Sequence, residues 1–296
     1  MKFSRLLISL FFPASMTIAH KYIFPSEPQV PLAPPPLSQA PDSRRIIIQT
    51  SSRSISGSYP LYDLLSISTE SGSISVDVTP HPASSEDPSQ PASLEIKSRS
   101  GSVHATFSEG FFNSFVDRDD DPNTNYRGGY EKTAIQPGIP AREYITSVNT
   151  QSASISGTFP LGSRTSLDAQ SGSIGVELVV VPVSRSGPRR LRTISHGGMQ
   201  SVRVVHDNFW PMVKEAWWEG MVSEHESHSG LISVEYPDSW EGTIEVEAHS
   251  GSISVTGRGV EIVREWQGRM IARKGKAGGG KVIVRAWSGS VDLRFG

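Results

Sequence analysis

The chain repeats a short element, Ser-Gly-Ser or Ser-Gly-Leu followed by Ile or Val, and this repetition constrains its fold more than any other feature. Six copies begin at these serines: Ser71, Ser100, Ser171, Ser229, Ser250 and Ser288. Two related segments, Ser52–Gly57 and Ser152–Gly157, each begin 19 residues before one of these copies. The period is therefore about twenty residues, which predicts an array of similar units stacked on one another.

Apolar and polar residues alternate on both sides of each element. After the first serine, apolar residues stand at the third, fifth and seventh positions, as at Ile74, Val76 and Val78. Before it they stand at the sixth and fourth positions, as at Leu65 and Ile67. Alternation with a period of two predicts half-buried strands. Because the parity changes across the Ser-Gly, both strands can face one core only if the element is a bend or a turn, which glycine permits.

Two all-β architectures satisfy this pattern. In a parallel β-solenoid, each Ser-Gly-Ser is a corner and successive corners stack in a column. In an antiparallel β-meander or sandwich, each Ser-Gly is a two-residue hairpin turn. We favour the solenoid because Ser-Gly is a weaker hairpin signal than Asn-Gly or Asp-Gly.

The N-terminal part of the chain differs from the repeats. Residues 1–19 combine early basic residues, a short apolar run and small residues, as a secretory signal peptide does. The run is shorter than a membrane-spanning helix requires, so membrane contact is expected at most through this segment, with a membrane anchor as the alternative. Residues 20–44 are rich in proline and predict an extended linker. The repeat domain is expected over 45–296.

Three segments interrupt the repeats. Residues 109–143 are polar and rich in turn-forming residues, and residues 182–193 are basic, so both are expected to be loops. Residues 207–222 have the apolar spacing of a helix, which would cover an open end of the strand array.

The repeats, together with the segments Tyr236–Ile244 and Ser250–Gly257, resemble those of an adhesin family of β-helical repeat domains, in particular its fungal members. The resemblance covers residues 45–296. It implies a β-solenoid and a secreted or cell-surface setting. It brings no catalytic residue, because the family has no established active site.

Composition excludes several functions. The formal net charge of −2 argues against nucleic-acid binding, and the absence of cysteine removes disulfides, thiolate metal sites and cysteine nucleophiles. No Gly-x-Ser-x-Gly motif marks a serine nucleophile. The acidic segment 117–123 has the alternating oxygens of a calcium loop but has Pro122 where that loop needs glycine. We assign no catalytic, cofactor-binding or metal-binding residue.

Two weaker patterns remain. Asp77, Glu177 and Glu235 share one position of the repeat and could stack as a ladder of carboxylates, as in a carbohydrate-active β-helix enzyme. His225 and His228 flank Glu226, but their spacing of three differs from the helical spacing of a metalloprotease. We expect these histidines to lie at the surface.

The favoured function is therefore non-enzymatic: a secreted or surface-displayed protein that presents a long Ser/Thr-lined face for adhesion or cell-wall association. Its partner would be a glycan or a cell-surface protein. Tryptophan stacks on sugar rings and partner surfaces, and four of the six tryptophans cluster, which makes them the candidate contact surface. They are Trp210, Trp217, Trp218 and Trp240. The alternative role for this cluster is to seal an apolar end of the strand array.

Overall fold

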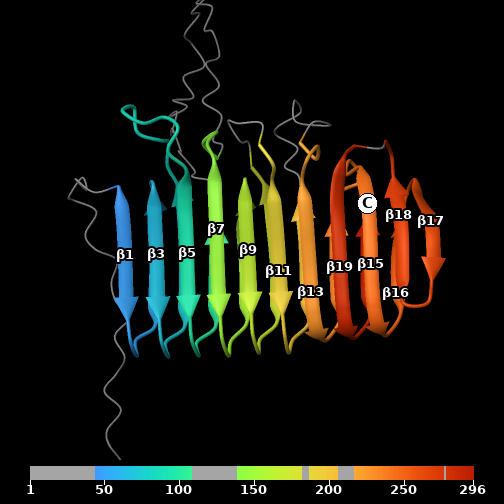
Figure 1. Ribbon diagram of the computed structural model, residues 1–296. Helices are drawn as coiled ribbons and strands as arrows, with labels where there is room; N and C mark the ends of the chain where they lie inside the picture. Colours follow the sequence, from blue (N-terminus) through green and yellow to red (C-terminus); the bar gives the residue numbers. More distant parts are fainter. Residues whose placement is uncertain (1–43, 109–138, 182–186, 206–216, 277) are drawn as a thin grey trace, which may run out of the picture. The chain divides into compact units, whose positions relative to one another are not determined.

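The computed structural model describes residues 44–108, 139–181, 187–205, 217–276 and 278–296. These residues form twenty β-strands and no helix. The strands build two large, mostly parallel sheets (Figure 1). None of the described residues belongs to a helix long and apolar enough to cross a membrane. The first strand begins at Arg45, where the sequence predicts the start of the repeat domain.

The larger sheet has eleven strands. Their spatial order is β1 (Arg45–Thr50), β3 (Leu64–Thr69), β5 (Ala92–Ser98), β7 (Tyr144–Thr150), β9 (Arg164–Ala169), β11 (Arg190–Ser195), β13 (Val222–Ser229), β19 (Gly280–Ser288), β15 (Gly242–Ser250), β18 (Arg269–Lys274) and β17 (Val260–Trp266). All neighbours in this sheet pair in parallel, including β15 with β19, except that β18 pairs antiparallel with both β15 and β17.

The smaller sheet has nine strands, all paired in parallel. Their order is β16 (Ile253–Gly257), β20 (Val291–Phe295), β14 (Ile232–Tyr236), β12 (Gln200–Val205), β10 (Ile174–Val180), β8 (Ile155–Leu161), β6 (Val103–Phe107), β4 (Ile74–Pro80) and β2 (Ile55–Leu61). From β1 to β14 the chain alternates between the sheets, and inward side chains from both form one buried hydrophobic cluster.

The Ser-Gly-Ser elements are bends that carry the chain from one sheet to the other. β3 and β4 flank Ser71 but belong to different sheets, so the hairpin alternative is wrong for these elements. Side chains on both sides of the bend point into the same core, as the change of parity requires: Leu65, Ile67, Ile74 and Val76 are all buried.

The corner glycines lie in one column, as a stacked repeat predicts. A Cβ added at Gly101 would lie 1.8 Å from the carbonyl oxygen of Gly72, and one at Gly72 would lie 2.0 Å from that of Arg53. The same close approach continues down the column through Gly172, Gly198, Gly230, Gly289 and Gly251. Glycine is therefore needed here because neighbouring backbones touch.

Small hydroxyl side chains close the corners from the inside. The Gly101 N–H donates to Ser98 Oγ at 3.0 Å, and Ser98 Oγ donates to the Gly101 carbonyl at 2.5 Å. Thr150 donates in the same way to the Ala153 carbonyl at 2.6 Å. Because these buried hydroxyl groups are hydrogen-bonded to the backbone of the corner, a polar residue can occupy the last inward position before the corner without an unpaired polar group in the core.

The last repeat lies out of chain order. β19 pairs with β13 on one side and with β15 on the other, and β20 likewise lies between β14 and β16. Ser288 therefore aligns with both Ser229 and Ser250, although the sequence spacing predicts that the latter two neighbour each other. The C-terminal repeat thus intercalates between two earlier ones.

Several segments differ from the sequence expectations. Arg190–Thr193, expected in a basic loop, belongs to β11, because Leu191 is an inward core residue. The described part of the expected helix, 217–222, forms a turn that leads into β13. Ile253 and Val255 are only half-buried, because β16 is the edge strand of its sheet. The segments 1–43, 109–138, 182–186 and 206–216 lie outside the described residues.

Candidate functional site

Three of the four candidate contact tryptophans are inside the protein. Trp217, Trp218 and Trp240 are at most 2% exposed, and Trp210 lies outside the described residues. Trp240 packs at 4.8 Å from the ring of Phe295, and Trp218 meets Tyr236 edge-on at 6.5 Å. These three side chains therefore fill the core beside β13 and β14, which lie inside their sheets and not at an end of the strand array, and they offer no surface to a partner.

Among the described residues two tryptophans are exposed, and neither belongs to the candidate contact surface expected from the sequence. Trp287 is 49% exposed on β19, and Trp266 is 41% exposed on β17. For Trp287 the signal was available, because Val282, Val284 and Ala286 alternate inward and place it on the outer face. Trp266 lies on β17, outside the Ser-Gly-Ser repeats, so the alternation of the repeats does not predict which face of the sheet it occupies.

Trp287 belongs to a row of four stacked rings, which we call the ring ladder: His196, His228, Trp287 and His249. His228 lies 5.2 Å from Trp287 at an interplanar angle of 6°, and His249 lies 5.6 Å away on the other side at 3°. His196 and His228 are 4.5 Å apart at 26°.

The parallel register produces this ladder. In the strand pairing, Trp287 aligns with both His228 and His249, since the residues on each side of it are paired. All four side chains are exposed and immediately precede or follow the ends of β11, β13, β19 and β15. Because neighbouring rings cover one another's faces, the ladder presents ring edges and N–H groups to the solvent.

A row of alternating charges runs beside the ladder on β13, β19 and β15 and continues onto β18. In register order it consists of Glu226, Arg285, Glu247 and Arg269. Arg269 donates twice to Glu247 Oε1, at 2.6 and 3.1 Å. In the same region Lys281 contacts Glu245 at 2.8 Å.

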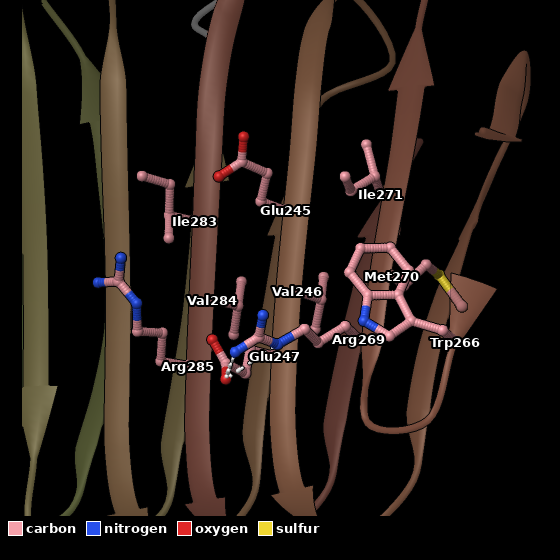
Figure 2. Close-up of a pocket in the computed structure, with 10 residues that line it drawn as sticks. All are labelled: Glu245, Val246, Glu247, Trp266, Arg269, Met270, Ile271, Ile283, Val284 and Arg285. Carbon is pink, nitrogen blue, oxygen red and sulfur yellow. Dashed lines mark hydrogen bonds and ion pairs between the residues drawn. The ribbon is translucent and has the colours of Figure 1, made fainter. Parts of the chain in front are cut away.

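Four of these side chains, Glu245, Glu247, Arg269 and Arg285, line a cavity of about 280 Å³, shown in Figure 2. Its lining combines Trp266 and Met270 with Glu245, Glu247, Arg269 and Arg285. The Arg264 guanidinium lies 5.8 Å from the Trp266 ring centre. The cavity therefore offers an aromatic surface next to hydrogen-bonding charged groups, the combination that binds small polar ligands with apolar faces.

Each of the two carboxylates that line this cavity forms an ion pair with a basic side chain. Glu245 and Glu247 lie two residues apart on the outer face of β15, about 7 Å along the strand. Lys281 holds the first and Arg269 the second. A glycosidase uses two carboxyl groups that flank the scissile bond, whereas both of these carboxylates are already bonded to basic side chains.

The expected ladder of carboxylates is interrupted by arginine. On the nine-stranded sheet the register order is Glu177, Arg203, Glu235 and Arg294, so opposite charges alternate. Arg203 approaches Glu177 at 3.9 Å and Glu235 at 3.5 Å. Asp77 lies on β4, three strand spacings from Glu177. These carboxylates do not converge on one groove.

The two neighbouring histidines of β13 face opposite sides of the sheet. His228 joins the ring ladder, whereas His225 is 1% exposed and inward, contrary to the expectation that both lie at the surface. Nδ1 of His225 lies 2.7 Å from Thr193 Oγ1, and Nε2 lies 3.0 Å from the Tyr236 hydroxyl. Burial lowers the pKa of His225 to about 3, which keeps the ring neutral. Among the described residues no cluster of three metal-ligating side chains occurs.

Comparisons of the chain with family models, with curated proteins and with solved structures find no match.

Proposed function

We propose that the chain is a β-solenoid, secreted or displayed at the cell surface, that serves adhesion or cell-wall association by binding a glycan without cleaving it. The solenoid interpretation is supported by the alternation of strands between two parallel sheets and by the column of corner glycines. The setting is supported by the signal-like composition of residues 1–19 and by the resemblance to adhesin repeats.

One observation carries the binding proposal. The exposed tryptophans of the described residues, Trp266 and Trp287, both lie on the C-terminal strands of the 11-stranded sheet, and Trp266 lines a cavity together with charged groups. Exposing a large aromatic ring to water is unfavourable unless a partner covers it, and aromatic residues dominate binding surfaces. The Trp266 indole can cover the apolar face of a sugar while carboxylates and guanidinium groups bond its hydroxyls. Trp287, whose two faces are stacked on His228 and His249, contributes a ring edge.

The ring ladder and the charge row also support an extended ligand. Both run across the strands at the inter-strand spacing of about 4.8 Å, so similar groups recur at regular intervals. A polymer with repeating units can contact several of these groups at once, and each added contact strengthens the binding of the whole chain.

The test uses the full chain in two parallel assays. Glycan arrays and co-sedimentation with insoluble wall polysaccharides measure binding, and release of reducing ends from the same polysaccharides measures cleavage. The proposal predicts saturable binding and no release of reducing ends. Hydrolysis that disappears in the Glu245→Gln or Glu247→Gln variant would instead support a carbohydrate-active enzyme, and absence of binding to every polysaccharide would contradict both functions.

A further inference from the structure

A second cavity, of about 310 Å³, lies where β7, β9, β11 and β13 begin, at the opposite end of these strands from the ring ladder. Three arginines line it: Arg164, Arg189 and Arg190. The rest of the lining consists of Glu143, Ile145, Ser163, Pro188 and Val222, so its net formal charge is +2. We call it the arginine cavity.

Two of its arginines stand directly side by side. Arg164 on β9 and Arg190 on β11 are paired in the strand register, and both are exposed. Like charges directly opposite each other destabilise a sheet. Among the described residues neither side chain makes an ion pair or a side-chain hydrogen bond, although other arginines of this sheet, such as Arg269, bind a carboxylate.

The third arginine is held in place without a counter-ion. Arg189 donates to the Trp217 carbonyl at 2.5 Å, and its guanidinium lies 4.9 Å from the centre of the Trp217 ring. Its Nε atom is buried and has no hydrogen-bond partner among the described residues. A guanidinium held by a carbonyl group and an aromatic ring has little side-chain freedom left to lose when an anion binds it.

We propose that the arginine cavity binds the anionic groups of an acidic polysaccharide. Arginine suits this role because its planar fork makes two parallel hydrogen bonds to a sulfate or a carboxylate. The inference rests on the proposed glycan-binding function and adds the chemical class of the glycan. A polymer can contact the arginine cavity and the ring ladder at once, which a single sugar cannot. The distance between them along β11, from Arg190 to His196, is six residues or about 20 Å.

The experiment measures the affinity of the full chain for four immobilised polymers of matched length. Dextran sulfate carries sulfate esters, polygalacturonate carries carboxylates, dextran is neutral, and single-stranded DNA carries phosphates on a different backbone. The variants are Arg164→Gln, Arg190→Gln and the double variant. Arg99→Gln is the matched control, because Arg99 is an exposed arginine that immediately follows β5, at the opposite end of the strands from the arginine cavity.

The proposal predicts that at least one acidic polysaccharide binds more tightly than dextran and that salt weakens this binding. Each variant of the arginine cavity should bind it about tenfold more weakly, the loss expected for one charge-assisted hydrogen bond. Arg99→Gln should bind as the unmodified chain does. The difference between dextran sulfate and polygalacturonate identifies the anionic group.

The inference is overturned by equal affinity for dextran and both acidic polymers, by equal losses in Arg99→Gln and Arg190→Gln, or by tightest binding to DNA. Circular dichroism melting of each variant confirms that it is folded, and an unchanged affinity in a folded double variant also overturns it. Tight binding of dextran through Trp266 and Trp287 with no preference for charge would leave the proposed function standing and refute this inference alone.

Discussion

Replacement of Gly101 by alanine tests the column of touching backbones. The added Cβ would lie 1.8 Å from the Gly72 oxygen, 2.3 Å from the Gly72 carbonyl carbon and 2.7 Å from the Ser73 nitrogen. These are backbone atoms in the middle of a sheet junction, so they cannot rotate away as a side chain would. The two neighbouring corners must separate locally by about 1 Å or more.

That separation acts on hydrogen bonds that flank the corner. Ile74 N–H donates to the Ser102 carbonyl at 2.9 Å, and Ser100 N–H donates to the Glu70 carbonyl at 3.0 Å. A buried backbone group that loses its partner costs roughly 1–3 kcal/mol. Loss or distortion of both bonds therefore destabilises the fold by about 4 kcal/mol, which lowers the melting temperature by roughly 8–16 °C for a domain of this size.

Gly175 provides the matched control. It lies in β10, no atom stands within 4 Å of an added Cβ, and its backbone is not in the left-handed region. Gly175→Ala should leave stability unchanged or raise it by about 0.4–1 kcal/mol through the unfolded chain. Urea unfolding followed by circular dichroism compares the two variants. A Gly101→Ala protein within about 1 kcal/mol of the unmodified chain would refute the close stacking of the corners.

Two further predictions concern the order of the repeats and the buried histidine. Because the chain has no cysteine, the double variant Ser229→Cys with Ser288→Cys should form a disulfide on oxidation, as should Ser250→Cys with Ser288→Cys. The pair Ser229→Cys with Ser250→Cys should not, because two strand spacings exceed disulfide reach, and efficient bonding there in mass spectrometry would contradict the intercalated repeat. The pKa of His225 is about 3 when folded and about 6.5 when unfolded, so its contribution to stability is complete above pH 6.5 and is lost as pH falls. Between pH 6.5 and 4.5 the unmodified chain should lose roughly 2–3 kcal/mol more than His225→Gln in urea unfolding, and equal losses would show that the ring is accessible to protons.

Alternation alone predicted most of the strands. Wherever apolar residues kept a period of two around Ser-Gly-Ser, as at Ile74 and Val76, the strand and the buried face agree with the structure. β11 and β12 were missed because Thr193 and Gln200 occupy inward positions there, where they bond each other at 2.7 Å. A buried polar pair of this kind has the sequence signature of a loop, since only the fold reveals its partner.

The order of the last strands was not predictable from the repeats. β19 pairs equally regularly with β13 and with β15. No local sequence pattern therefore shows whether the last repeat lies between two earlier repeats or follows them at the end of the array. The ring ladder could not be predicted from the sequence for the same reason. His228, Trp287 and His249 are scattered in the sequence, and only this strand order stacks them.

Equilibrium binding of a polysaccharide found in the binding screen tests the central claim most directly. The full chain is compared with Trp266→Ala, Trp287→Ala and the control Ile47→Ala, which removes a side chain 58% exposed at the far edge strand, β1, of the same sheet. The account predicts that each tryptophan variant binds about five- to tenfold more weakly, as expected for an aromatic contact worth more than about 1 kcal/mol, and that Ile47→Ala binds normally. Unchanged affinity in both tryptophan variants, with all proteins melting cooperatively, would contradict a glycan-binding face on the C-terminal strands.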